Sequence, residues 1–217
     1  MGSLSTKMIS KYDIDLCIVD FDETLVRSEK IKKKAFKKIL GEKYFQMLKQ
    51  LILKGNPREV IFRKYIKLLD KEITQEAYSS DLLQLMDQFK SCTEKNIINS
   101  GIDKGVVEFL NETKSIFPLI INSVTPVNSL QNILRLLKID HIFSAIVGGK
   151  LPKVEAMKQV LNFNSKNYKN ILIIGDSEHD HMLANNLNGY FLLVPPNINL
   201  GNFYRVLKNK DVWNVCK

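Results

Sequence analysis

The amino-acid sequence predicts a three-layer α/β protein, with a mostly parallel sheet at its core and an all-helical domain inserted into it. Short apolar runs alternate with helical patterns over the C-terminal part of the chain. Strands that alternate with helices are typical of right-handed βαβ units. Residues 27–103, by contrast, show helical patterns without a strand-like run. This interval is therefore expected to form the inserted domain.

Five short apolar runs are the expected strands of the sheet. They cover residues 15–19, 117–121, 144–147, 170–174 and 190–194. Runs of this length and composition suit strands that are buried on both faces. Between the later runs, apolar residues recur at helical spacing around residues 130–137, 156–161 and 182–187, and Gly189 is placed to end the last of these helices.

The inserted interval predicts four helices. Its apolar stripes lie at residues 31–40, 44–52, 60–69 and 82–89, and each has the spacing of one helix face. The expected breaks are Gly41, residues 55–57 and the step from Ser79 to Ser80. The core domain is then residues 1–26 and 104–217, and the helical domain is residues 27–103. The aromatic and methionine side chains of the stripes are expected to form its core.

Composition excludes several classes of protein. With 217 residues, 45% of them hydrophobic and 25% charged, the chain can bury a core without disulfides. Its apolar runs are too short for a membrane span, and its three cysteines are too scattered for a disulfide scaffold or a zinc site. We therefore expect a soluble, cytoplasmic protein. Gly2 fits the loose N-myristoylation pattern, but a disordered leader is the simpler interpretation because the pattern matches often by chance.

The net charge of +9 is concentrated in the helical interval. Residues 27–103 contain 17 basic and 10 acidic residues, and the rest of the chain contains 15 and 13. A basic helical domain favours an anionic substrate, although a solvated, lysine-rich face without a ligand fits the pattern as well. Nucleic acid is compatible with this charge, but no pattern of aromatic and arginine residues supports it.

Polar side chains follow the predicted strands at their carboxyl ends, where open parallel sheets bind ligands. They come from the segments after the first, second and fourth strands and from the start of the helix before the fourth. The set is Asp20, Asp22, Thr24, Ser123, Lys153, Asp176 and Asp180. Because these segments meet at one edge of the sheet, we expect the side chains to form one site.

The carboxylates of Asp20, Asp22 and Asp176 would crowd negative charge into that site, which requires a cation. Oxygen ligands without histidine or cysteine select a hard ion, and a site that keeps waters and binds phosphate suits Mg²⁺ better than Ca²⁺. With the metal holding one aspartate ionised, that carboxylate can act as a nucleophile and its neighbour can transfer protons. Lys153 and the Ser123 hydroxyl are suited to phosphoryl oxygens.

These residues resemble the motifs of the haloacid dehalogenase superfamily, in its phosphatase branch and near the phosphoglycolate phosphatases. The first motif, an apolar strand followed by DxDxT, is present as CIVDFDETL; the second, a strand ending in Ser or Thr, as PLIINS; the fourth, GDxxxD, as GDSEHD. The third is a lysine ahead of a helix. Order and spacing match over residues 12–195. The resemblance implies a Rossmann-like core with a helical cap of the first type that closes over the site.

The resemblance also implies a role for each residue. Asp20 is the expected nucleophile that forms an aspartyl-phosphate, and Asp22 the acid that protonates the leaving oxygen and then deprotonates water. The implied Mg²⁺ ligands are the Asp20 side chain, the Asp22 backbone carbonyl and Asp176. Asp180 supports these ligands, Thr24 stabilises the loop, and Ser123 and Lys153 hold phosphoryl oxygens. The acid at Asp22 favours phosphoryl chemistry over carbon–halogen cleavage.

Two assignments leave alternatives. The motif-three lysine is Lys153 or Lys150; the helix start after Lys153 favours Lys153. The motif-two hydroxyl is Ser123 or Thr125: the segment reads NSVTP where members of the family more often have Thr followed by Asn, and Ser123 is favoured. His179 and His181 flank Asp180, but adjacent helix positions point in different directions, so a solvated or capping role is expected rather than zinc binding.

The function that follows is a Mg²⁺-dependent phosphomonoesterase acting on a small phosphorylated metabolite. A phosphomutase of the β-phosphoglucomutase type would share every motif. A phosphatase of nucleic-acid ends would use the basic helical domain. A non-catalytic binding module on the same scaffold is a further alternative, against which the intact set of aspartates argues.

Overall fold

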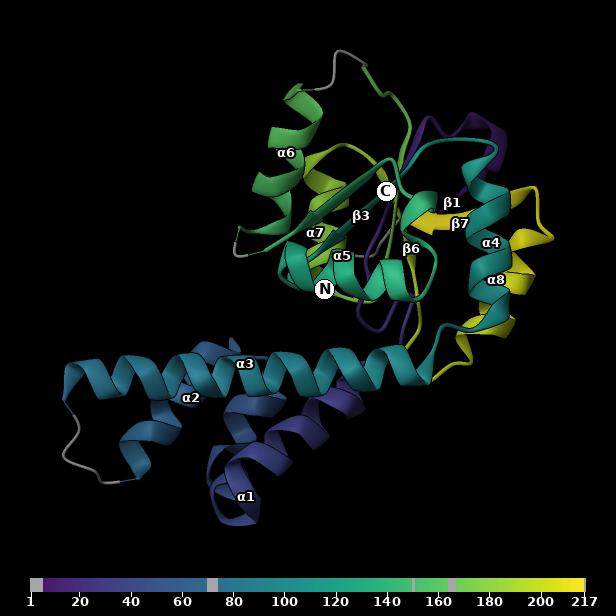
Figure 1. Cartoon of the computed structure of the whole chain (residues 1–217). Coiled ribbons are helices and arrows are strands. Elements are labelled where there is room, and N and C mark those ends of the chain that lie inside the picture. Colours follow the sequence, from purple (N-terminus) through teal and green to yellow (C-terminus); the bar gives the residue numbers. More distant parts are fainter. Residues whose placement is uncertain (1–5, 70–73, 150, 164–166, 217) are drawn as a thin grey trace. The chain divides into compact units, whose positions relative to one another are not determined.

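The structure, a computed structural model, describes residues 6–69, 74–149, 151–163 and 167–216. Gly2 and Lys150, which the sequence singles out, lie outside the described residues. The chain divides into two compact units: Ser28–Asn99 forms one, and Met1–Arg27 together with Ser100–Lys217 forms the other. Each is described by itself (Figure 1).

A seven-stranded sheet forms the core of the larger unit, in the order β1-β7-β6-β5-β2-β3-β4. The five predicted strands are confirmed to within two residues, and they are parallel: β2 (Leu16–Val19), β3 (Leu119–Ser123), β4 (Ala145–Gly148), β5 (Ile171–Gly175) and β6 (Tyr190–Leu193). Two further strands, β1 (Thr6–Ser10) and β7 (Val212–Cys216), pair antiparallel beyond β6. The mostly parallel α/β fold is therefore confirmed.

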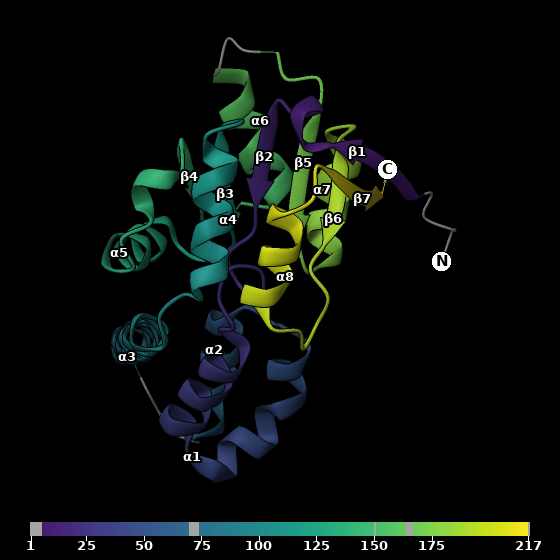
Figure 2. The ribbon, with the colours of Figure 1, turned by 90° about the vertical axis from the view of Figure 1, so that its right-hand side faces the viewer.

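Helices cover both faces of the sheet and make it the middle of three layers. One face carries α6 (Lys153–Phe163) and α7 (Glu178–Asn186), whose Met157 and Leu183 pack against Leu16, Ile18 and Ile173 of the central strands. The other face carries α4 (Lys104–Lys114) and α8 (Leu200–Lys208), which lie side by side in Figure 2. Burial on both faces explains why the central strands read as continuous apolar runs.

The remaining elements of this unit are short. The helix α5 (Val127–Leu136) packs against β4, and single 3₁₀ turns form at η1 (Lys11–Asp13) and η2 (Asp140–Ile142). The sequence patterns did not predict the helices α4 and α8. No helix within the described ranges combines the length and the apolar character needed to cross a bilayer.

The helical unit contains α1 (Glu29–Leu53), α2 (Arg58–Leu68) and α3 (Gln75–Ser100). Gly41, with φ of 72° and ψ of 162°, divides α1 into two helical stretches, so the breaks at Gly41 and at residues 55–57 are confirmed. The expected break at Ser79–Ser80 is wrong, because both serines lie inside α3. The Ser79 hydroxyl donates to the Gln75 carbonyl at 2.9 Å, which satisfies it within the helix.

Aromatic rings fill the centre of the helical unit, as the apolar stripes predict. Phe36 from α1, Phe62 from α2 and Phe89 from α3 are buried, and their ring centroids lie 4.4 to 5.9 Å apart. Tilted and edge-on rings at these distances are favourable packing arrangements. The stripes thus supply the core of the insert.

In the larger unit, α4 and α8 approach closely at a pair of glycines. A Cβ atom built on Gly105 would lie 2.2 Å from the carbonyl oxygen of Gly201, which belongs to the backbone of α8 and cannot rotate away. Asp103 caps α4 beside this contact by accepting the Gly105 N–H at 2.8 Å. Absence of side chains at this crossing lets α4 and α8 pack together on the sheet.

We expect Gly105→Ala to lower the free energy of unfolding by about 1–3 kcal/mol, the usual cost of overpacking. Lys104→Ala, on the exposed side of the same helix start, should change it by less than about 0.5 kcal/mol. Urea denaturation followed by circular dichroism measures both. Equal stability of the two variants would contradict the assigned contact.

Candidate active site

The carboxyl edge of the parallel sheet gathers the residues that the sequence singles out. Asp20 directly follows β2, Ser123 ends β3, and Asp176 directly follows β5. Lys153 begins α6, and Asp180 lies in the first turn of α7. Because β2 pairs in parallel with both β3 and β5, the segments after these strands emerge side by side. All five residues belong to the larger unit.

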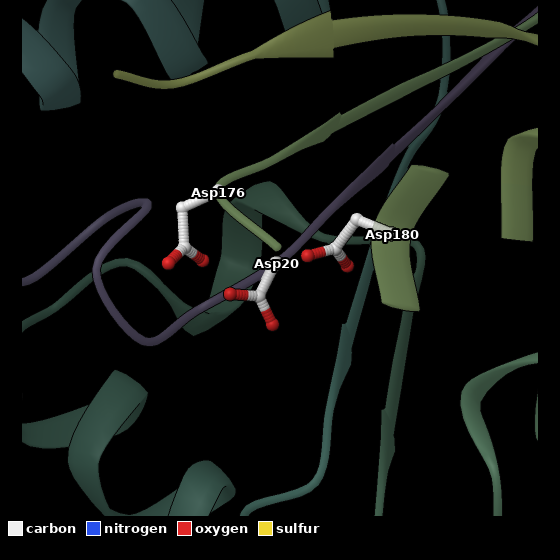
Figure 3. A group of neighbouring side chains, drawn as sticks. All are labelled: Asp20, Asp176 and Asp180. Carbon is white, nitrogen blue, oxygen red and sulfur yellow. The ribbon is translucent and has the colours of Figure 1, made fainter. Parts of the chain in front are cut away.

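Three carboxyl groups form an acidic cluster at this edge. Asp20, Asp176 and Asp180 each offer an oxygen, and these oxygens lie within 4.8 Å of one another. Figure 3 shows the three side chains converging from β2, β5 and α7. Within the described ranges, this is the group of His, Cys, Asp and Glu side chains whose geometry suits a metal ion.

The Lys153 ammonium group lies within this cluster. Its Nζ donates to Oδ1 of Asp20 and, at 2.6 Å, to Oδ1 of Asp180. All three side chains are at least nine-tenths buried. Burial alone would lower the pKa of Lys153, but the carboxylates of Asp20 and Asp180 outweigh it and raise the pKa above its ordinary value. Lys153 therefore stays protonated at neutral pH.

The aspartates of the cluster hold more negative charge than Lys153 offsets. Burial raises the pKa of Asp20 to about 7, and the nearby Asp180 and Asp22 act in the same direction against Lys153. Burial, followed by the charge of Asp180, also raises the pKa of Asp176. A cation bound here would stabilise the ionised carboxylates. The hard oxygen donors and their charge thus fit Mg²⁺.

Asp180 is oriented by its own helix terminus. The Ser177 hydroxyl and the Ser177 N–H both donate to its Oδ2, forming a capping box at the start of α7. Its other oxygen, Oδ1, accepts a hydrogen bond from Nζ of Lys153. Gly175 makes room for this arrangement, because a Cβ there would lie 2.3 Å from Cγ of Asp180.

Thr24 connects two of the clustered aspartates. Its hydroxyl lies 3.2 Å from Oδ2 of Asp20 and 3.4 Å from Oδ1 of Asp176. Its carbonyl accepts a hydrogen bond at 3.2 Å from the hydroxyl of Tyr204, a fully buried residue of α8. Thr24 is itself fully buried, so the loop after β2 is held from two sides.

Asp22 lies beside the loop that follows β3. Thr125 Oγ1 donates to Oδ2 of Asp22 at 2.9 Å, and Ser123 Oγ lies 3.5 Å from the same oxygen. Both hydroxyls that the sequence offers for motif two are thus at the site. The acidic cluster of Asp20, Asp176 and Asp180 does not include the Asp22 side chain.

Sequence reasoning misses two residues that shape the site, Tyr204 and Arg27. The Arg27 guanidinium donates to the carbonyls of Glu23 and Ile198, both at 2.9 Å, and so joins the loop after β2 to the loop after β6. Glu23 has a positive φ of 57°, a strained conformation that this contact helps to hold. The local sequence does not reveal these roles, because the contacts of Tyr204 with Thr24 and of Arg27 with Ile198 join segments that are distant along the chain.

The two histidines next to Asp180 do not join the acidic cluster. His179 is exposed, and the His181 ring packs 5.3 Å from the ring of Phe191. The cluster of possible metal ligands contains neither.

A parallel sheet that presents carboxylates and a lysine at its carboxyl edge places the chain among α/β proteins that bind ligands at strand ends. The profile of the haloacid dehalogenase-like hydrolases matches residues 17–194. The chain belongs to this family. A comparison with curated proteins gives no match.

Solved structures share the fold. A haloacid dehalogenase-like hydrolase of Streptococcus pneumoniae has 20% sequence identity and a TM-score of 0.61, with 92% of each chain covered. A protein of Haemophilus somnus, described as a predicted phosphoglycolate phosphatase, has 21% identity and a TM-score of 0.63 over 90% of this chain and 97% of that one. A Bacillus subtilis protein, described as a HAD-hydrolase bound to magnesium, has 14% identity and a TM-score of 0.62 over 86% and 91%.

We expect Gly175→Ala to destabilise the fold chiefly through Asp180. In an Asp180→Gly background the atoms that meet the new Cβ are absent, so the same substitution should cost less there. A double-mutant cycle measured by urea denaturation should give a coupling free energy of about 0.5–3 kcal/mol. Additive costs would show that Gly175 does not make room for Asp180.

Proposed function

We propose that the protein is a Mg²⁺-dependent phosphomonoester hydrolase that acts on a small phosphorylated metabolite through an aspartyl-phosphate on Asp20. The observation that carries the proposal is the buried Asp20 carboxyl group at the end of β2, contacted by Lys153 and Thr24. Asp22, which carries the proposed acid, is two residues further along the chain. Family membership and the site chemistry support this assignment.

The reaction has two displacements at phosphorus. First, a carboxylate oxygen of Asp20 bonds to phosphorus, the bond from phosphorus to the ester oxygen breaks, and the Asp22 carboxyl group gives its proton to that oxygen. Then a water oxygen attacks the aspartyl-phosphate and Asp22 takes the proton of that water. The bond between phosphorus and the Asp20 oxygen breaks, and its electron pair returns to the Asp20 carboxylate. Inorganic phosphate leaves, and both carboxyl groups are back in their starting states.

Lys153 and Ser123 are the residues proposed to hold the phosphoryl oxygens. Lys153 is protonated, buried and already adjacent to the nucleophile, where a fixed positive charge stabilises charge that spreads during transfer. The Ser123 hydroxyl stands at the end of β3, next to β2. A charged donor from the start of α6 and a neutral donor from the end of β3 would thereby hold the phosphoryl group.

The metal ligands in this proposal are a side-chain oxygen of Asp20, the backbone carbonyl of Asp22, and Asp176, with Asp180 supporting them. The closeness of Asp20, Asp176 and Asp180 supports this set, as do the raised pKa values of Asp20 and Asp176. When bound, Mg²⁺ supplies positive charge that draws phosphoryl oxygens to the nucleophile and offsets their charge. The magnesium-bound fold relative from Bacillus subtilis is consistent with this choice.

We expect Asp20→Asn to lower kcat for hydrolysis of nitrophenyl phosphate by on the order of 10³-fold or more, because the amide cannot replace the nucleophile. The matched control is Asp15→Asn at the opposite end of the same strand. Asp15 accepts backbone N–H groups of Lys169 and Asn170, and an amide oxygen can still accept these, so activity should persist. Hydrolysis that survives Asp20→Asn would exclude the proposed mechanism.

Phosphate release assays also separate the alternatives. Free phosphate from a panel of phosphorylated metabolites supports a hydrolase, whereas a sugar phosphate returned as its isomer would indicate a phosphomutase. Salt-sensitive binding of oligonucleotides would instead favour action on nucleic-acid ends.

Mg²⁺ should raise the melting temperature of the wild-type protein, because a ligand that binds only the folded state stabilises it. Asp176→Asn should reduce this shift, since it removes one charged ligand from the cluster, whereas Asp15→Asn should leave it unchanged. Thermal denaturation with added Mg²⁺ or with a chelator measures the effect without reference to activity. An equal shift in wild type and Asp176→Asn would contradict the proposed ligand set.

A further inference from the structure

Two hydroxyl groups from the loop after β3 approach one oxygen of Asp22. The contact from Thr125 Oγ1 is 2.9 Å long, whereas that from Ser123 Oγ is 3.5 Å. Hydrogen bonds between oxygens usually span about 2.5–3.0 Å. Of these two hydroxyls, Thr125 therefore makes the closer contact with the Asp22 carboxyl group, and Ser123 is at the outer limit of such a contact.

The backbone around Thr125 is held on three sides. Its N–H donates to Ser123 Oγ at 3.1 Å. Its carbonyl oxygen faces Gly148 in β4, where a Cβ atom would lie only 2.5 Å away. Pro126, with φ of −53°, follows at once as the N-cap of α5. These contacts fix the backbone position from which the Thr125 side chain extends toward Asp22.

The two hydroxyls are thus not equivalent. The Ser123 oxygen already accepts a hydrogen bond from the Thr125 N–H, and this leaves its O–H to donate. Its contact with Asp22 is long, whereas Thr125 donates to Asp22 at ordinary distance. A hydrogen bond of ordinary length to one carboxyl oxygen restricts the direction of that carboxyl group.

We propose that Thr125 is a positioning residue that orients the Asp22 carboxyl group for proton transfer to the leaving oxygen, while Ser123 serves the phosphoryl group. The inference rests on the proposed function and deepens it. Thr125 touches neither phosphorus nor the ester oxygen. It acts through Asp22, whose proton moves to the ester oxygen as the bond from that oxygen to phosphorus breaks.

This division of roles predicts a dependence on the leaving group. Dinitrophenolate departs without a proton, because its charge is delocalised, whereas phenolate departs slowly unless an acid protonates it. The value of kcat/KM reports steps up to the first departure of the leaving group. Loss of the Thr125 hydroxyl should therefore lower kcat/KM for phenyl phosphate far more than for dinitrophenyl phosphate.

The experiment compares Thr125→Val, Thr125→Ser and wild type on these two esters with Mg²⁺ present. We expect Thr125→Val to lose about 10- to 100-fold in kcat/KM on phenyl phosphate, part of the 10²- to 10⁴-fold that acid–base catalysis supplies, and less than about 3-fold on dinitrophenyl phosphate. Valine has the shape of threonine without the hydroxyl, so a folded variant is expected. Thr125→Ser should restore most of the loss.

Ser123→Ala provides the contrast. A residue that contacts the phosphoryl group is needed for both esters, so this variant should lose similar factors on the two. Equal losses for Thr125→Val on both esters, or failure of Thr125→Ser to restore activity, would overturn the role of Thr125. Turnover of dinitrophenyl phosphate by Asp20→Asn would instead overturn the proposed function, which keeps the two failures distinguishable.

Discussion

The candidate site depends on the buried ammonium group of Lys153 and the two carboxyl groups that accept from it. Asp20 stands at the end of the central strand β2, Asp180 lies in the first turn of α7, and Lys153 begins α6. Charged groups are tolerated in a protein interior only when partners of opposite sign surround them. Each of these three groups is therefore stable because of the others, and their contact joins the sheet to both helices on one of its faces.

The parallel sheet supplies the rigid frame for this contact. Its central strands are apolar on both faces, so packing from α4, α6, α7 and α8 fixes them and their carboxyl ends emerge in register. Two glycines allow other groups to come close to the backbone: Gly175 leaves space for the Asp180 side chain, and Gly105 leaves space for the backbone of α8. The acidic cluster is thus held by backbone geometry as well as by side-chain contacts.

The loops that carry the polar groups are held by residues from elsewhere in the chain. The Tyr204 hydroxyl of α8 contacts the Thr24 carbonyl, and Arg27 joins the loop after β2 to the one after β6. Thr125 and Ser123 reach Asp22 from the loop after β3. A site assembled from several loops, each with its own anchor, can keep the carboxyl groups of Asp20 and Asp22 and the ammonium group of Lys153 at fixed separations.

The sequence by itself determined the five parallel strands, most of the insert and the residues of the acidic edge, because apolar periodicity and polar groups after strands are local signals. It missed β1 and β7, the short antiparallel strands at one end of the sheet, and it placed a break at Ser79–Ser80, where a hydroxyl is satisfied inside a helix. Only the tertiary structure decided which groups meet. The contacts of Tyr204 with Thr24, of Thr125 with Asp22 and of Lys153 with Asp180 join residues far apart in sequence, and such pairs form only when the sheet register brings their segments together.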